Sequence, residues 1–108
     1  MSTIVDTDKI DLITRTSNGD VKLIMVEVRP WENVSLLEIQ EKFHTYLDFI
    51  EGGHLVRQYP DAQGARLIIR LDTVETPPTE MSIFFDVVQR EWLSPAGIGF
   101  ELGKFIID

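Results

Sequence analysis

The segment VSLLEIQEKFHTYLDFIEGGH, residues 34–54, carries the strongest structural signal in the sequence. Its apolar residues recur at helical spacing, and such a helix must bury that face against another part of the fold. Ser35 followed by Glu38 is a capping box, which predicts that the helix begins there. Gly52-Gly53 predicts its end, because glycine readily adopts the left-handed conformation found beyond a helix C-terminus. The apolar stripe comprises Leu36, Ile39, Phe43, Tyr46, Leu47 and Ile50.

The residues before this helix predict a β-hairpin. Two β-rich runs, residues 9–16 and 21–28, flank Ser17-Asn18-Gly19-Asp20, and Asn-Gly is the strongest short signal for a hairpin turn. The second run is apolar at nearly every position, which is typical of a central strand covered on both faces. Its two faces carry Val21, Leu23 and Met25, and Ile24, Val26 and Val28.

The residues after the helix predict a second hairpin and a second helix. Residues 54–59 and 66–73 have strand composition, and residues 60–64 supply turn-forming Pro, Asp and Gly. The second helix is predicted to begin with Thr79 as its N-cap and to end at residues 94–97, where Pro and Gly occur. Its apolar face comprises Met81, Phe84, Phe85, Val88 and Trp92.

Residues 97–107 alternate apolar positions with small or charged ones, which predicts a last strand. The order is therefore ββα-ββα-β. The expected fold class is α+β, a two-layer sandwich in which two helices cover an antiparallel sheet. Residues 1–8 are polar and are expected to be disordered or frayed. The rest, residues 9–108, has the length of a single α+β domain with one core.

Composition narrows the classes of function. The 108 residues carry a net charge of −8, with 18 Asp and Glu against 10 Lys and Arg, and the basic residues are scattered. Without a basic stripe to displace counterions from phosphates, nucleic-acid binding has little physical support. The absence of cysteine excludes disulfides and thiolate chemistry. We find no signal peptide and no apolar run of membrane-spanning length, so we expect a cytoplasmic protein that does not bind membranes.

Residues that can ligate a metal gather around the end of the first helix. His44 and Asp48 are four residues apart and Glu51 is three further, so a helix places them along one edge. His54 follows the two glycines. A metal-binding protein or metal-dependent enzyme using His44, Asp48 and His54 is therefore an alternative hypothesis. The surface of any acidic helix gives the same spacing, and we favour that interpretation.

Catalytic motifs are lacking in the sequence. It contains no G-x-S-x-G elbow and no G-x-x-x-x-G-K-[ST] phosphate loop, and GIGFELG at residues 97–103 follows a helix instead of opening one. The carboxylates of Glu75 and Glu80 have no evident apolar pocket that would separate two pKa values. We therefore expect no catalytic residue and no cofactor.

Three parts of the sequence resemble a family of small bacterial proteins of unknown function. They are Ile10-Asp11-Leu12-Ile13, the run LLEIQEKFHTYLDFIEGG at residues 36–53, and Tyr59-Pro60-Asp61 followed by Gly64. The similarity spans most of residues 8–93 and rests mainly on core and capping positions. The resemblance implies a bacterial, cytosolic, non-secreted single-domain protein. It carries over no catalytic residue.

These observations favour a non-enzymatic binding module. It would recognise a protein partner, or self-associate as a homo-oligomer such as a dimer, through a face or an edge of the sheet. Small acidic bacterial domains of this kind include toxin-neutralising immunity proteins and regulatory adaptors. The comparison of this chain with them is an analogy based on fold class and charge. A small-molecule pocket between helices and sheet is a further hypothesis. The candidate contact residues are Trp31, Ile24, Val26, Val28 and Trp92.

Overall fold

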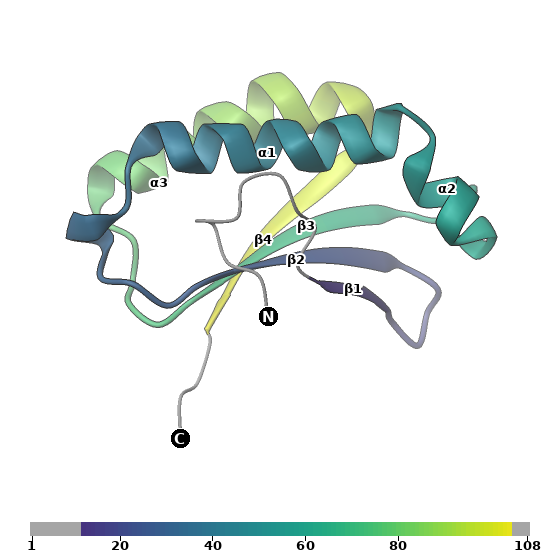
Figure 1. Ribbon diagram of the computed structural model, residues 1–108, viewed down its shortest axis with the longest axis horizontal. Coiled ribbons are helices and arrows are strands. Elements are labelled where there is room, and N and C mark those ends of the chain that lie inside the picture. Colours follow the sequence, from purple (N-terminus) through teal and green to yellow (C-terminus); the bar gives the residue numbers. More distant parts are fainter. Residues whose placement is uncertain (1–11, 105–108) are drawn as a thin grey trace.

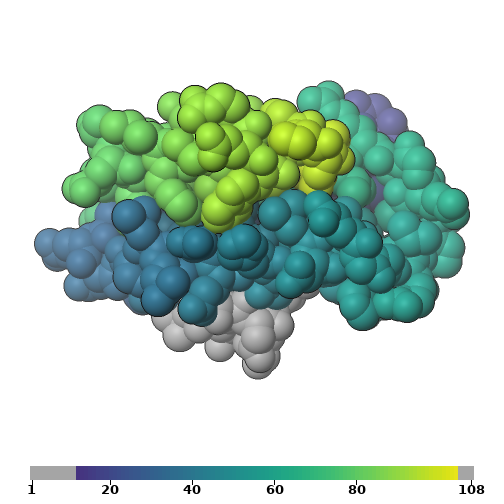
Figure 2. Space-filling model, turned by 90° about the horizontal axis from the view of Figure 1, so that it is seen from above, coloured from purple at the N-terminus to yellow at the C-terminus, as the bar shows by residue number. Residues whose placement is uncertain are grey.

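Four strands and three α-helices make up residues 12–104, the part of the chain that the computed structural model describes. Helices α1 and α3 lie side by side on one face of the sheet (Figure 1 and Figure 2), and the predicted α+β fold is confirmed. Within these residues, no helix has the length and apolar character that crossing a membrane requires. Residues 1–11 and 105–108, and with them the predicted disordered or frayed segment 1–8, lie outside the described residues. The elements are β1 (Leu12–Arg15), β2 (Val21–Glu27), α1 (Leu36–Glu51), α2 (His54–Gln58), β3 (Leu67–Thr73), α3 (Thr79–Val88) and β4 (Ile98–Lys104).

The sheet has the order β1-β2-β3-β4 and is mixed. β1 pairs antiparallel with β2, as the Asn-Gly turn predicts, and Gly19 has the positive φ of 91° that suits such a turn. β2, β3 and β4 run parallel, with Val21 opposite Leu67 and Leu67 opposite Ile98. The prediction of an antiparallel sheet is therefore wrong. Parallel neighbours need a crossover connection, and the helices between these strands supply it.

The error lies in residues 54–59, which contain helix α2 where a strand was predicted. Gly53 follows α1 with a φ of 81°, and the chain turns directly into a second helix. The N–H of Tyr59 donates to the carbonyl of Leu55 at 2.7 Å, and the Leu55 side chain is buried. Without a strand in this segment, β3 has no hairpin partner and pairs parallel with β2 instead. The observed order is ββααβαβ.

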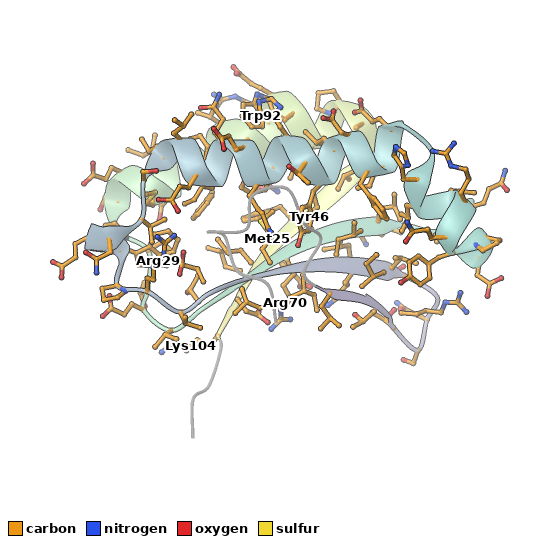
Figure 3. All side chains as sticks on the ribbon, in the orientation of Figure 1. Met25, Arg29, Tyr46, Arg70, Trp92 and Lys104 are labelled. Carbon is orange, nitrogen blue, oxygen red and sulfur yellow. The ribbon has the colours of Figure 1, made fainter. Side chains whose placement is uncertain are left out.

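α1 begins and packs largely as the sequence predicts. Ser35 Oγ accepts the N–H of Glu38 at 3.1 Å, which confirms the predicted cap. Tyr46 Oη donates to the carbonyl of Ile24 at 3.0 Å, and Figure 3 shows Tyr46 between α1 and the sheet. Leu36 departs from the prediction, because it is 47% exposed. The core beneath the helices includes Leu23, Met25, Ile39, Phe43, Ile69 and Leu71, all fully buried.

α3 differs from the prediction at both ends. Pro78 occupies the N-cap position in place of Thr79, and among residues 12–104 no side chain caps the helix. Pro78 is extended, and its carbonyl accepts the first backbone hydrogen bonds of the helix, so the helix starts one residue earlier than predicted. After Val88 the chain continues through a π-helical turn at Gln89–Leu93 and a 3₁₀ turn at Ser94–Ala96. The predicted last strand, residues 97–107, is confirmed over Ile98–Lys104 as β4, and residues 105–107 lie outside the described residues.

Candidate binding site at the carboxyl ends of the parallel strands

A groove lies where β2 and β3 end and where α1 and α3 begin. Because β2 and β3 are parallel, the loops that follow them leave the sheet at the same end, where the carboxyl ends of these strands lie. Ligands of parallel sheets usually bind at this end. The groove has a volume of about 710 Å³, and we call it the carboxyl-end groove. Its apolar lining comprises Trp31, Val34, Leu36 and Met81.

Trp31 joins the two loops that form the walls of this groove. Its indole N–H donates to the carbonyl of Glu75 at 2.9 Å, and the hydroxyl of Thr73 donates to the same carbonyl at 2.8 Å. The Trp31 ring packs edge-on against Phe85 of α3, with the ring centroids 6.1 Å apart. The loop after β2 and the loop after β3 are therefore tied together.

An ion-pair network fixes the loop after β2. Arg29 Nη2 lies 2.6 Å from Oε1 of Glu27 and 2.8 Å from Oε2 of Glu38, so it joins the end of β2 to the first turn of α1 (Figure 3). The Glu27 side chain is fully buried, and its Oε2 accepts the backbone N–H of Arg29 at 2.8 Å. The hydrogen bond to Glu27 raises the pKa of Arg29, and the hydrogen bond from Arg29 lowers the pKa of Glu38. One guanidinium therefore joins two carboxylates, and these contacts hold the loop after β2 in place.

Acidic side chains line the rim of the groove. Glu32, Glu75 and Glu80 are all exposed there, and among the described residues no lysine or arginine lines the groove. The N-terminal ends of α1 and α3 alone would favour an anion, because their free N–H groups carry partial positive charge. The three carboxylates oppose that preference. The groove therefore favours a cationic group over a phosphate.

Apolar surface continues from the floor of the groove to its rim. Trp31, Val34 and Met81 are almost fully buried and form the floor. Leu36, in the first turn of α1, is 47% exposed, and its neighbour Leu37 is 62% exposed. Exposed leucines beside a hollow are typical of a surface that another molecule covers. The groove suits a ligand that carries both a cationic and an apolar group.

The predicted metal ligands lie apart from this groove and do not form a three-ligand site. His44 lies against Trp92, with ring centroids 4.7 Å apart, and His54 stacks on Phe49 with centroids 6.1 Å apart. Asp48 is exposed on α1. Within residues 12–104, no three His, Asp or Glu side chains form a group that could hold a metal ion.

The residues predicted to contact a partner are spread over the molecule. Trp31 lines the carboxyl-end groove. Trp92 is half-buried against His44 of α1. Ile24 and Val26 belong to the row of β2 that faces away from the core cluster, and Val28 follows β2 and is 39% exposed. The structure therefore brings only Trp31 of this set into the groove.

Sequence reasoning missed the acidic rim. The sequence shows no apolar pocket near Glu75 and Glu80, yet both residues line the groove. Nothing in the sequence marks Glu32 as a binding residue, and it lines the groove as well. The useful signal is the pair of proline-containing loops, at residues 29–33 and 76–79, each placed between a strand and a helix. Those loops coincide in space only if β2 and β3 are parallel.

Residues 1–105 match the model of DUF6572, a family of unknown function. The chain belongs to this family, which confirms the resemblance to small single-domain proteins of unknown function. It has no significant match among curated proteins or among solved structures. Bacterial origin and a cytoplasmic location stay predictions.

Proposed function

We propose that this DUF6572 member is a non-enzymatic binding module that recognises a protein partner through the carboxyl-end groove. The observation that carries the proposal is the combination of an apolar floor with a rim of three exposed glutamates. An apolar centre surrounded by a polar rim is the usual arrangement of a protein interface. The partner would present an apolar anchor next to lysine or arginine.

A protein partner fits the groove better than a small anionic ligand does. Nucleotides and phosphate esters use helix N-termini, but here three carboxylates would repel them. Leu36 lines the groove and is 47% exposed, and Leu37, the next residue of α1, is 62% exposed. A macromolecule can cover both the hollow and this adjoining surface, whereas a small ligand would leave the leucines in water.

The test requires a partner, and the products of neighbouring genes are the first candidates. The full chain would be co-purified with each of them, and any complex would then be titrated by calorimetry. The variant E32K/E80K reverses two of the charges at the rim, and E41K/E51K reverses two exposed charges of α1 that do not line the groove. We expect E32K/E80K to weaken binding by at least about tenfold and the control to change it by less than about twofold.

Thermal unfolding of both variants separates a binding defect from a folding defect. All four substituted side chains are exposed, so we expect little change in stability. Equal affinity of E32K/E80K and the wild type for the partner would refute the proposal. So would an equal loss of affinity in the two variants, because it would indicate attraction by net charge alone.

A further inference from the structure

β4 is an unpaired edge of the sheet among the described residues. It pairs with β3 on one side, and within residues 12–104 no strand lies on its other side. An open edge presents backbone N–H and C=O groups that can pair with another strand. Proteins usually protect such edges by keeping them short or by adding proline, bulges or charges.

β4 lacks much of this protection. It has seven residues, two of them glycine and none proline, whereas the opposite edge strand β1 has four residues. Its helix-facing row, Ile98, Phe100 and Leu102, is apolar. Leu102 is 47% exposed and lines two hollows, one of about 330 Å³ against α3 and one of about 280 Å³ at the end of β4.

We propose that two copies of this chain pair antiparallel along β4, about a two-fold axis that passes through Leu102. The two sheets then form one continuous sheet with the helices of both copies on the same face. This inference uses β4 and not the carboxyl-end groove, so it is independent of the proposed function. A two-fold contact must be self-complementary, because the same surface faces itself.

The residue pairs follow from this symmetry. An axis perpendicular to the sheet sets helix-facing residues opposite helix-facing residues. Centring the axis on Leu102 places Leu102 opposite its own copy, Phe100 opposite Lys104, and Glu101 opposite Gly103. Centring it on Glu101 would instead place two carboxylates opposite each other, which is unfavourable.

On the helix-facing side, the register brings opposite charges together. Asp86 of α3 and Phe100 line the same hollow, and Asp86 is exposed. Lys104 of the second copy lies opposite Phe100 in this register and therefore enters that hollow. Its ammonium group would meet the Asp86 carboxylate. The symmetry repeats this pair, so the interface contains it twice.

The outer face of the sheet carries an arginine that is already paired. A Cβ atom on Gly103 would collide with the guanidinium of Arg70 and with the carboxylate of Asp72, so both groups lie over Gly103, and Arg70 Nε is 2.6 Å from Asp72 Oδ1. Figure 3 shows Arg70 on the face of the sheet opposite the helices. Glu101 of the second copy lies opposite Gly103 and would meet both charges of this pair, so the attraction between the copies comes from Asp86 and Lys104. The same chain supplies both of these residues, and the two-fold axis sets each against the other, which favours a second copy over an unrelated peptide.

A cysteine at the two-fold axis tests the register directly. The chain has no cysteine, so L102C introduces a single thiol into each copy. Under mild oxidation we expect rapid disulfide-linked dimers, visible on a non-reducing gel, because the two thiols face each other. L12C is the matched control, since Leu12 is 48% exposed and lies on β1, at the opposite side of the sheet. Cross-linking of L12C as fast as L102C, or no cross-linking of L102C, would overturn the proposal.

Charge reversal tests the interface without cysteine. K104E alone places a glutamate against Asp86 in both contacts, and D86K alone places a second lysine against Lys104. A mixture of the two variants restores an opposite-charge pair at both contacts of a mixed dimer. By sedimentation equilibrium, we expect the mixture to associate about tenfold more tightly than either variant alone. Equal association of the mixture and the separate variants would contradict the register, and a wild type that stays monomeric would end the proposal.

Discussion

Removing Arg29 tests whether its ion pair with Glu27 stabilises the fold. The substitution is Arg29→Met, which keeps most of the aliphatic side chain and removes the guanidinium. Glu27 has no exposed side-chain surface, and Arg29 approaches it with Nη2 at 2.6 Å and Nε at 3.0 Å from Oε1. The variant would leave a buried carboxylate without its counter-charge.

The magnitude follows from this burial. Breaking one partner out of a buried ion pair costs about 3–5 kcal/mol. Two features of the structure favour the lower end. The Arg29 side chain is 25% exposed, so water can reach the carboxylate once the guanidinium is gone, and the backbone N–H of Arg29 still donates to Glu27. We therefore expect a loss of about 3 kcal/mol in the free energy of unfolding.

The assay is urea denaturation of the full chain, followed by far-ultraviolet circular dichroism. A loss of about 3 kcal/mol lowers the midpoint by about 1–3 M urea. The double variant E27M/R29M removes both charges and is expected to recover most of the loss, because it leaves no unpaired carboxylate at position 27. Arg90→Met is the surface control, since Arg90 is 70% exposed and its contact with Glu91 is 3.9 Å long. It should change the stability by less than about 0.5 kcal/mol.

Two results would refute this reasoning. One is an Arg29→Met variant within about 1 kcal/mol of the wild type, which would mean that water or another group already compensates Glu27. The other is a double variant as unstable as the single one, which would mean that the stability lost came from packing and not from charge.

Three further predictions concern α1. Ser35→Ala removes the acceptor of the Glu38 N–H and should cost about 1 kcal/mol in thermal unfolding; no loss would contradict the cap. Gly53→Ala should cost about 1–2 kcal/mol in urea denaturation because φ is 81°, although no atom of the described residues lies within 4 Å of the added Cβ; an unchanged midpoint would contradict the conformation. The pKa of Glu38 is lowered by Arg29, so its stabilisation is present above about pH 4.3 and is lost as pH falls through the folded-state pKa. Glu38→Gln should flatten this acid limb of a urea-midpoint profile, and an identical limb would exclude the contribution.

The sequence predicts the structure best where local chemistry alone decides it. Ser35, Glu38 and Gly53 mark the ends of α1, because capping depends on residues within a few positions of one another. The hairpin at Gly19 is predictable for the same reason. None of these signals requires knowledge of where the rest of the chain lies.

Buried charge is harder to predict. Lys42 lies within the apolar stripe of α1 and is fully buried, with Nζ 5.7 Å from the centroid of the Tyr46 ring. Glu27 occupies a core-facing position at the end of β2. Spacing indicates which face a residue occupies but not which charges the fold will compensate there, since the compensating groups come from other segments.

The direction of β3 decides where the candidate site lies, and five residues determine that direction. Over a segment as short as His54–Gln58, strand and helix periodicity cannot be told apart, so HLVRQ is compatible with either. A strand there would have made β3 the return strand of a hairpin. The loop after β3 would then lie at the opposite end of the sheet from the loop after β2. As a helix, the segment completes a crossover, and both loops leave the sheet together. Trp31 and Glu75 could then form the hydrogen bond that joins the walls of the groove. One local misassignment was therefore enough to hide the site.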